Sequence, residues 1–163
     1  MAEVVVKRTP VFYGAVHLLF FREDEVLLLK RKNTGFEDGK WSVVAGRIDG
    51  NEEVKAAAIR EAKEEAGVDI DPSELEVTGI AHRRNPNGSG SEWIDFYLTV
   101  RAWKGEIMNM EPHKCEELRW FPLSELPSNM IEYVKVALSE NQDKLWFRSI
   151  GWDAVVSQAA SPK

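Results

Sequence analysis

Apolar and β-branched residues occur in short runs along the chain, and a polar or glycine-containing segment follows each run. The runs at residues 11–21 and 25–31 predict two paired strands joined by a polar turn. Three further strands and one short extended segment are predicted, at residues 75–81, 93–103, 118–121 and 41–45. Three loops rich in glycine, asparagine or aspartate are predicted, at residues 32–40, 46–51 and 83–91.

One long helix is predicted in the middle of the chain, at residues 52–66. It contains five alanines and no proline, and Gly67 is the residue type that commonly ends a helix. Asn51 is the expected N-cap, with Glu52 and Glu53 in the first turn.

Strands outnumber helices, which indicates a mixed sheet covered by helices, an α/β or α+β fold. A shorter helix is predicted from Ser128 or Asn129 to about residue 139. No repeat or linker divides the 163 residues. We therefore expect one domain at residues 1–156 and a disordered, small and polar tail at residues 157–163.

The composition, with 44% apolar and 29% charged residues, is that of a globular protein. The net charge of −6 argues against non-specific binding to nucleic acid. The longest apolar stretch is too short to span a membrane, and the N-terminus does not resemble a signal peptide. We therefore expect a cytoplasmic protein without a nucleic-acid or membrane partner, and a homodimer is left open. A phosphate-binding site in so acidic a chain would need a bound cation.

Three glutamates lie within one turn of the predicted long helix. The second and third of these glutamates lie three and four residues after the first, at Glu61, Glu64 and Glu65. Residues at these spacings share one region of the helix surface. Carboxylates crowded in this way repel each other, and a hard divalent cation such as Mg²⁺ would remove that repulsion. For this short run alone, a solvated helix face is an equally good interpretation.

The spacing around these glutamates is more specific. Gly46 is followed by five residues and Glu52, then by seven residues and Arg60, and the motif continues to Val68. This matches the complete Nudix signature, G-x5-E-x7-R-E-U-x-E-E-x-G-U, in which U is aliphatic. Its seven fixed positions would coincide by chance in about one window in 10⁸ at ordinary residue frequencies. The chain thus resembles Nudix hydrolases, which implies a mixed sheet sandwiched between helices.

The resemblance also implies roles for the residues of the motif. Mg²⁺, for which Mn²⁺ could substitute, would be held by the Ala45 carbonyl and by the carboxylates of Glu61, Glu64 and Glu65. Glu61 or a neighbour would help to deprotonate the attacking water. Glu52 and Arg60 would form an ion pair that orients the loop and the helix. The expected catalytic group is therefore Glu52, Arg60, Glu61 and Glu64.

Candidates outside the motif each have a plainer alternative. Arg83 and Arg84 could contact phosphate groups or be solvated loop charges. Trp41 could stack on a base or pack in the core. Asn129 could contact the base or cap the last helix.

A late glutamate is the remaining candidate for a metal ligand or a base. Glu116 and Glu117 precede the strand predicted at residues 118–121, and the alternative is that they are surface charges. Glu111 is a weaker candidate.

The substrate implied by the resemblance is a small nucleotide containing a diphosphate. Residues 27–31 and 33–41 look like those of MutT-type hydrolases, which favours cleavage of a nucleoside triphosphate to the monophosphate and pyrophosphate. ADP-ribose or a nucleotide sugar is the alternative substrate, and a non-catalytic nucleotide-binding module is the alternative function.

Overall fold

The structure is a computed structural model, and it describes residues 11–85, 90–140 and 144–152. The predicted tail at residues 157–163 lies outside the described residues. Eight strands are present in the described part of the chain: β1 (Phe12–Arg22), β2 (Glu25–Arg31), β3 (Trp41–Ser42), β4 (Val44–Arg47), β5 (Leu75–Arg84), β6 (Glu92–Val100), β7 (Cys115–Pro122) and β8 (Trp146–Ile150). The helices are α1 (Val54–Glu61), which continues as a π-helix (Ala62–Ala66), and α2 (Glu132–Ser139). Short 3₁₀ helices lie at Pro72–Glu74 and Leu123–Glu125.

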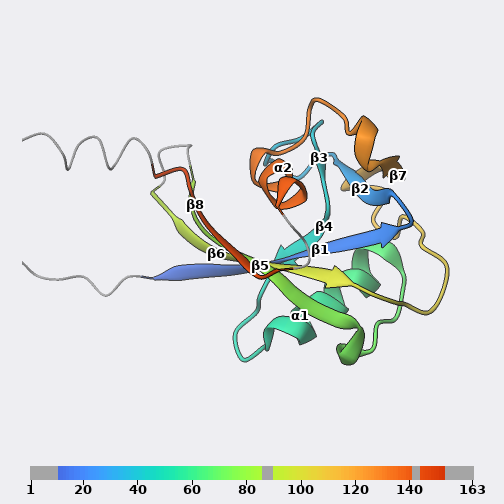
Figure 1. Cartoon of the computed structure of the whole chain (residues 1–163), viewed down its shortest axis with the longest axis horizontal. Coiled ribbons are helices and arrows are strands. Elements are labelled where there is room, and N and C mark those ends of the chain that lie inside the picture. The colour runs from blue at the N-terminus through green and yellow to red at the C-terminus, as the bar shows by residue number, and fades with distance from the viewer. Residues whose placement is uncertain (1–10, 86–89, 141–143, 153–163) are drawn as a thin grey trace, which may run out of the picture.

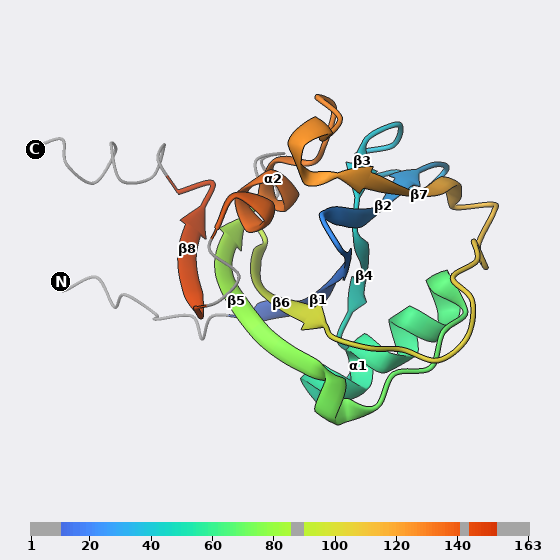
Figure 2. The same cartoon turned by 45° about the vertical axis from the view of Figure 1, so that its right-hand side comes forward.

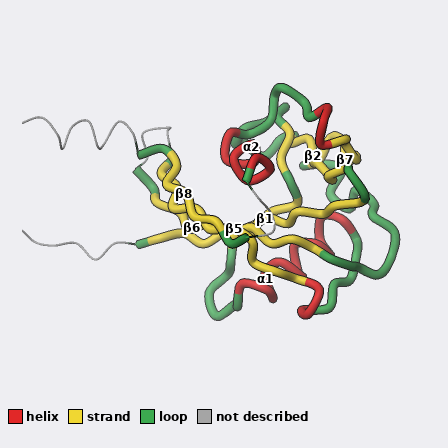
Figure 3. The backbone as a smooth tube through the Cα atoms, in the orientation of Figure 1, coloured by secondary structure: helices red, strands yellow, loops and turns green. Residues whose placement is uncertain are grey.

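The strands form one mixed sheet in the order β3-β2-β1-β6-β5-β8. The long strand β1 connects its parts: it runs parallel to β6 and antiparallel to both β2 and β4. Helix α1 lies on one side of the strands and α2 on the other (Figures 1 and 3). The turned view shows the same arrangement (Figure 2). The predicted sheet sandwiched between helices is confirmed.

Strand β1 is buried on both faces because helices cover both faces of the sheet. Residues 15–20 are all buried. Val16, Leu18 and Phe20 belong to the core on the α1 side, whereas Leu19 packs on the α2 side, as the twofold alternation of a strand requires. No helix in the described residues is long and apolar enough to cross a membrane.

The ends of the long helix differ from the prediction. The N-cap is Glu53, whose side chain accepts hydrogen bonds from the amides of Lys55 and Ala56. Asn51 is not the cap; it has a left-handed φ of 64° in the preceding turn. Gly67 ends the helix with a φ of 75°, as predicted, because glycine adopts this conformation without steric cost.

Two predicted loops begin differently in the structure. Gly46 and Arg47 belong to strand β4 rather than to a loop, because β1 provides them with ladder partners. Arg83 and Arg84 are likewise the last residues of β5, opposite β6. Of the loop predicted after them, residues 86–89 lie outside the described part.

The last helix begins later than expected. Its N-cap position is Ile131, which makes no side-chain capping bond. Ser128 and Asn129 precede it in a turn. Strand β8 was not predicted. It pairs with β5 across more than sixty intervening residues, and a pairing between such distant segments produces no local sequence pattern from which it could be predicted.

Replacing Gly79 should detach β8 from the sheet. Gly79 lies opposite Trp146 of β8, and a Cβ atom at position 79 would lie 2.1 Å from the indole ring. Because Trp146 is buried, it cannot move aside freely. We expect Gly79→Ala to lower the free energy of unfolding by about 1–3 kcal/mol, measured by urea denaturation. Gly50→Ala is the control, since nothing lies within 4 Å of the place that its methyl group would take; equal losses in both variants would contradict the prediction.

Candidate active site

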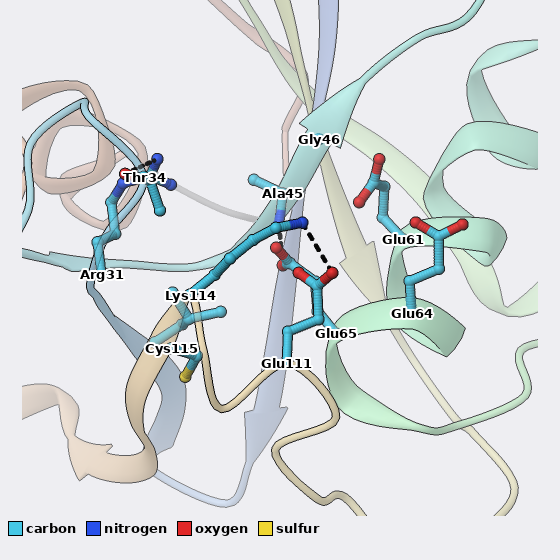
Figure 4. A pocket seen from close by; sticks show the side chains of 11 residues that line it. Arg31, Thr34, Ala45, Gly46, Glu61, Glu64, Glu65, Glu111, Lys114 and Cys115 are labelled. Atoms are coloured by element: carbon cyan, nitrogen blue, oxygen red, sulfur yellow. Dashed lines mark hydrogen bonds and ion pairs between the residues drawn. The ribbon is translucent and has the colours of Figure 1, made fainter.

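An acidic cavity of about 280 Å³ lies between strand β4, the long helix and the segment that precedes β7. Its walls carry four carboxylates together with the backbone of β4 (Figure 4). The residues that line it are Leu29, Arg31, Thr34, Ala45, Gly46, Glu61, Glu64, Glu65, Glu111, Lys114 and Cys115.

Glu61 reaches the cavity because residue 46 has no side chain. A Cβ atom at position 46 would lie 1.9 Å from Glu61 Oε1, far inside van der Waals contact. Gly46 therefore lets the helix approach the strand closely enough for Glu61 to lie against the β4 backbone. Burial raises the pKa of Glu61, and the adjacent Arg60 only partly offsets this effect.

Glu65 is a carboxylate with little compensation for its charge. Its Oε2 accepts a hydrogen bond from the Ala45 amide at 3.0 Å. Burial, together with the nearby charges of Glu61 and Glu111, raises the pKa of Glu65 to about 8 in spite of this bond. Crowded, poorly compensated carboxylate oxygens are the donors that a hard divalent cation prefers.

Arg60 holds the loop and the helix together. Its Nε and Nη2 donate to the two oxygens of Glu52 at 2.8 and 2.9 Å, and Nη2 also donates to the Arg47 carbonyl at 2.9 Å. The structure thus contains the predicted ion pair. These hydrogen bonds from Arg60 lower the pKa of Glu52 to about 2.

Arg60 also contacts two of the cavity glutamates. Its Nη1 lies 2.6 Å from Glu61 Oε1 and 3.3 Å from Glu64 Oε2. In the described residues, no three acidic, histidine or cysteine side chains are placed closely enough to surround one ion. Glu61 and Glu64 must therefore turn toward a cation for it to be held by several carboxylates at once.

Glu111 is the late glutamate that lies in this cavity. Lys114 donates to its Oε1 at 2.8 Å. The preceding segment is fixed to the end of the helix, because Met110 donates a backbone hydrogen bond to the Glu65 carbonyl. The local sequence gives no sign of this long-range contact, so it left Glu111 as a weak candidate.

Glu116 and Glu117 lie elsewhere. Glu116 pairs with Lys30 at 3.2 Å and Glu117 with Arg119 at 3.1 Å. Neither residue lines the acidic cavity, so the structure supports their alternative interpretation as charges beside a strand.

A second cavity, of about 310 Å³, adjoins the first. It combines aromatic side chains with arginines, and four residues belong to both cavities. Its lining residues are Ala15, His17, Arg31, Thr34, Phe36, Ala45, Gly46, Arg47, Arg83, Asn85, Trp93 and Tyr133.

Arg31 is placed at the wall that the two cavities share. Its Nε donates to the Phe36 carbonyl at 2.8 Å and its Nη2 to Thr34 Oγ1 at 2.9 Å. Both acceptors are neutral, and no carboxylate of the described chain forms an ion pair with Arg31. Its position at the end of β2, within a run of basic residues, did not single it out in the sequence.

Of the two arginines that were predicted to contact the substrate, only one lines a cavity. Arg83 lines the second cavity. Arg84, the next residue of β5, lies over the Trp152 ring at 5.8 Å and lines neither cavity.

Two further candidates are outside both cavities. Trp41 is only 5% exposed and packs edge-on against Phe121, so it is a core residue rather than a stacking platform. Asn129 donates its side-chain amide to the Gly39 carbonyl at 3.1 Å. It neither caps α2 nor lines the two cavities.

Known proteins resemble this chain over most of its length. A human protein named 8-oxo-dGDP phosphatase NUDT18 is 29% identical over 123 residues, which cover 74% of this chain and 35% of that protein. The NAD-capped RNA hydrolase NudC of Stutzerimonas stutzeri (strain A1501) is 32% identical over 123 residues, covering 76% of this chain and 41% of that protein. The chain therefore spans well under half the length of these two relatives.

A solved structure agrees with the fold. The MutT NUDIX hydrolase from Burkholderia pseudomallei superposes with a TM-score of 0.71 at 27% identity, covering 80% of this chain and 97% of that one. The NUDIX domain family matches residues 12–140, which run from the start of β1 to the end of α2. The signature at the acidic cavity and a family match that includes strands β1 to β7 lead to one conclusion: the chain belongs to the Nudix hydrolase family.

Proposed function

We propose that this Nudix hydrolase is a Mg²⁺-dependent enzyme that converts a nucleoside triphosphate to the monophosphate and pyrophosphate. The observation that carries the proposal is the pair of adjoining cavities, one lined by carboxylates and one by aromatic and basic side chains. A nucleotide has the same division, with a charged phosphate chain at one end and a planar base at the other. Mn²⁺ is expected to substitute for Mg²⁺.

The acidic cavity provides the oxygen donors for the cation. Glu61, Glu64, Glu65 and the Ala45 carbonyl would hold it, and these are hard oxygen ligands of the kind that Mg²⁺ prefers. When bound, Mg²⁺ offsets the charge of the diphosphate and makes a neighbouring water more acidic. Glu111, which accepts a hydrogen bond from Lys114 in the same cavity, would accept the proton of the attacking water.

Basic side chains supply the remaining contacts with the phosphates. Arg31 and Lys114 both line the acidic cavity. Among the described residues, Arg31 has hydrogen bonds only to neutral acceptors, so its charge is available to a phosphate oxygen. A guanidinium can bind such oxygens with two hydrogen bonds. Because hydrolysis of a phosphoanhydride depends mainly on positioning and electrostatics, this combination supports the proposed reaction.

The names of the relatives favour a nucleotide with a free phosphate chain. Besides the 8-oxo-dGDP phosphatase, a putative 8-oxo-dGTP diphosphatase 3 of Mycobacterium tuberculosis (strain CDC 1551 / Oshkosh) is 32% identical over 120 residues. The relative named an NAD-capped RNA hydrolase acts, by that name, on RNA. The absence of a nucleic-acid partner therefore stays a prediction, as do the cytoplasmic location and the oligomeric state. ADP-ribose or a nucleotide sugar is the alternative substrate class.

Hydrolysis should require a divalent cation. With a panel of nucleoside triphosphates and Mg²⁺, we expect monophosphate and pyrophosphate in equal amounts, detected by chromatography and a pyrophosphate assay. Excess chelator should abolish turnover, and added Mg²⁺ or Mn²⁺ should restore it, because the donors are all oxygens. Full turnover in excess chelator would refute the metal requirement, and release of inorganic phosphate alone would refute the cleavage position.

Neutralising one cavity carboxylate should slow the reaction without unfolding the protein. Glu64→Gln keeps the side-chain shape and removes a ligand charge. We expect kcat to fall at least about 100-fold, equivalent to roughly 2.7 kcal/mol of transition-state stabilisation, with little change in melting temperature because Glu64 is exposed. Glu132→Gln, at the exposed start of α2, is the control. Near-normal turnover of the Glu64 variant at saturating Mg²⁺ would remove Glu64 from the metal site.

Arg60 should act by positioning rather than by binding substrate. Arg60→Ala leaves Glu52 without its bidentate partner, so we expect the unfolding free energy to fall by about 2 kcal/mol and kcat to fall with it. Arg60→Lys keeps the positive charge but loses the paired N–H groups that bind both oxygens of Glu52. It should therefore recover only part of the lost stability and only part of the lost kcat. If thermal melts are unchanged and only KM rises, Arg60 contacts the phosphate instead.

A further inference from the structure

Lys114 brings a positive charge into the acidic cavity. It belongs to the segment before β7, and its side chain extends toward the carboxylates that line the cavity (Figure 4). Its Nζ donates to Glu111 Oε1 at 2.8 Å. This hydrogen bond, together with the charges of Glu111, Glu65 and Glu61, raises the pKa of Lys114. The ammonium therefore interacts with the charges of three cavity carboxylates at once.

The backbone that carries Lys114 is held by a hydrogen-bonded turn. Asn109 closes the turn, because its Oδ1 accepts from the Glu111 amide at 3.2 Å and its Nδ2 donates to the Cys115 carbonyl at 2.9 Å. The Lys114 amide donates to the Glu111 carbonyl, and the Lys114 carbonyl accepts from the Lys32 amide, both at 2.8 Å. The turn thus presents Glu111 and Lys114 together at the cavity.

The side chain of Lys114 is less constrained than its backbone. It is 52% exposed, and a lysine carries its ammonium on a flexible stem with donors that adapt to different acceptors. Arg31, which also lines the cavity, is held differently, because two of its nitrogens donate to the Phe36 carbonyl and to Thr34 Oγ1. Of these two basic side chains, Lys114 is the one that can change its partner.

A divalent cation in the acidic cavity would meet this ammonium. The proposed ligands include Glu61 and Glu65, whose charges also act on Lys114. Two cations beside the same carboxylates repel each other. A phosphate chain would instead bring several negative charges into the cavity and offer the ammonium new acceptors. Lys114 therefore opposes the cation alone and favours the cation together with a phosphate chain.

We propose that Lys114 is an internal counterion that couples the binding of the cation to the binding of the nucleotide. In the free protein it pairs with Glu111, and when cation and nucleotide bind together it moves to a phosphate oxygen. The move also releases Glu111 Oε1, which belongs to the group proposed to accept the proton of the attacking water. The inference rests on the proposed function for the nature of the nucleotide, whereas its first test needs only the protein and a cation.

The first test measures cation binding without nucleotide. Mn²⁺ is titrated into the wild type, Lys114→Gln and Lys114→Arg, and the free ion is quantified by electron paramagnetic resonance. Glutamine can still donate to Glu111 but has no charge, whereas arginine keeps the charge. Lys135→Gln is the matched control, because Lys135 also pairs with a glutamate three residues earlier, Glu132, and lines neither cavity.

We expect the Kd for Mn²⁺ to fall about threefold to tenfold in Lys114→Gln, because a like charge has been removed. This gain in affinity should shrink at high ionic strength. Lys114→Arg and Lys135→Gln should bind Mn²⁺ as the wild type does. An unchanged or higher Kd in Lys114→Gln would overturn the proposal, because Lys114 would then serve only to hold Glu111 in place.

The second test measures the coupling itself. Analogues of ATP and GTP with a methylene group between the α- and β-phosphorus atoms cannot be cleaved at that position, so their binding is measured by calorimetry. The Kd in excess chelator divided by the Kd at saturating Mg²⁺ gives the coupling factor. We expect this factor to be at least about threefold smaller in Lys114→Gln than in the wild type, and unchanged in Lys135→Gln. Equal weakening of nucleotide binding in both conditions would overturn the proposal, because Lys114 would then contact phosphate independently of the cation.

Failure of the proposed function has a different signature. If no triphosphate is hydrolysed, but Lys114→Gln binds Mn²⁺ more tightly and shows a smaller coupling factor, the counterion role stands and the proposed reaction fails. If triphosphates are hydrolysed with Mg²⁺, but Mn²⁺ affinity does not respond to the charge at position 114, the reaction stands and the counterion role fails.

Discussion

The acidic cavity depends on the charge of one arginine. Arg60 binds both oxygens of Glu52 and the carbonyl of Arg47, and it also contacts Glu61. These partners come from the loop before the helix, from strand β4 and from the helix itself. Without this cation, carboxylates packed against one strand would repel each other and separate the helix from the sheet. Among the described residues, Glu65 is not a hydrogen-bond partner of Arg60. Burial raises the pKa of Glu65, and a divalent cation is the partner that its carboxylate favours.

A second requirement is the close approach of helix and strand. Gly46 is necessary because the Glu61 carboxylate occupies the space that a side chain would need. This explains in physical terms why the signature begins with glycine. The ladder between β4 and β1 then fixes the carbonyl and amide groups of Ala45 at the cavity, so the proposed metal site would be built on the sheet.

The sequence predicted what depends on local spacing, and it failed where distant segments meet. The shared helix surface of the three glutamates and the helix end at Gly67 follow from positions only a few residues apart, whereas the Arg60–Glu52 pair was implied by the resemblance to the family signature. Glu111 could not be chosen over Glu116, because the choice depends on a backbone bond between Met110 and the end of the helix. Burial decided the interpretation of Trp41, and sequence pattern does not distinguish an aromatic residue in the core from one at a ligand.

Asp95 shows the same limit. In the sequence it is one polar residue within an apolar strand, yet it is fully buried and holds Arg83 and His17 in place. Arg83 was expected in a loop, where it would be free to contact phosphate. As part of β5 it is instead neutralised by a carboxylate on the adjacent strand, while Arg31 has only neutral acceptors. The two arginines are therefore not equivalent: within the described residues Arg31 has no carboxylate partner, whereas Arg83 has one. Under the proposed function, this difference favours placing the phosphate chain beside Arg31, in the acidic cavity, rather than beside Arg83.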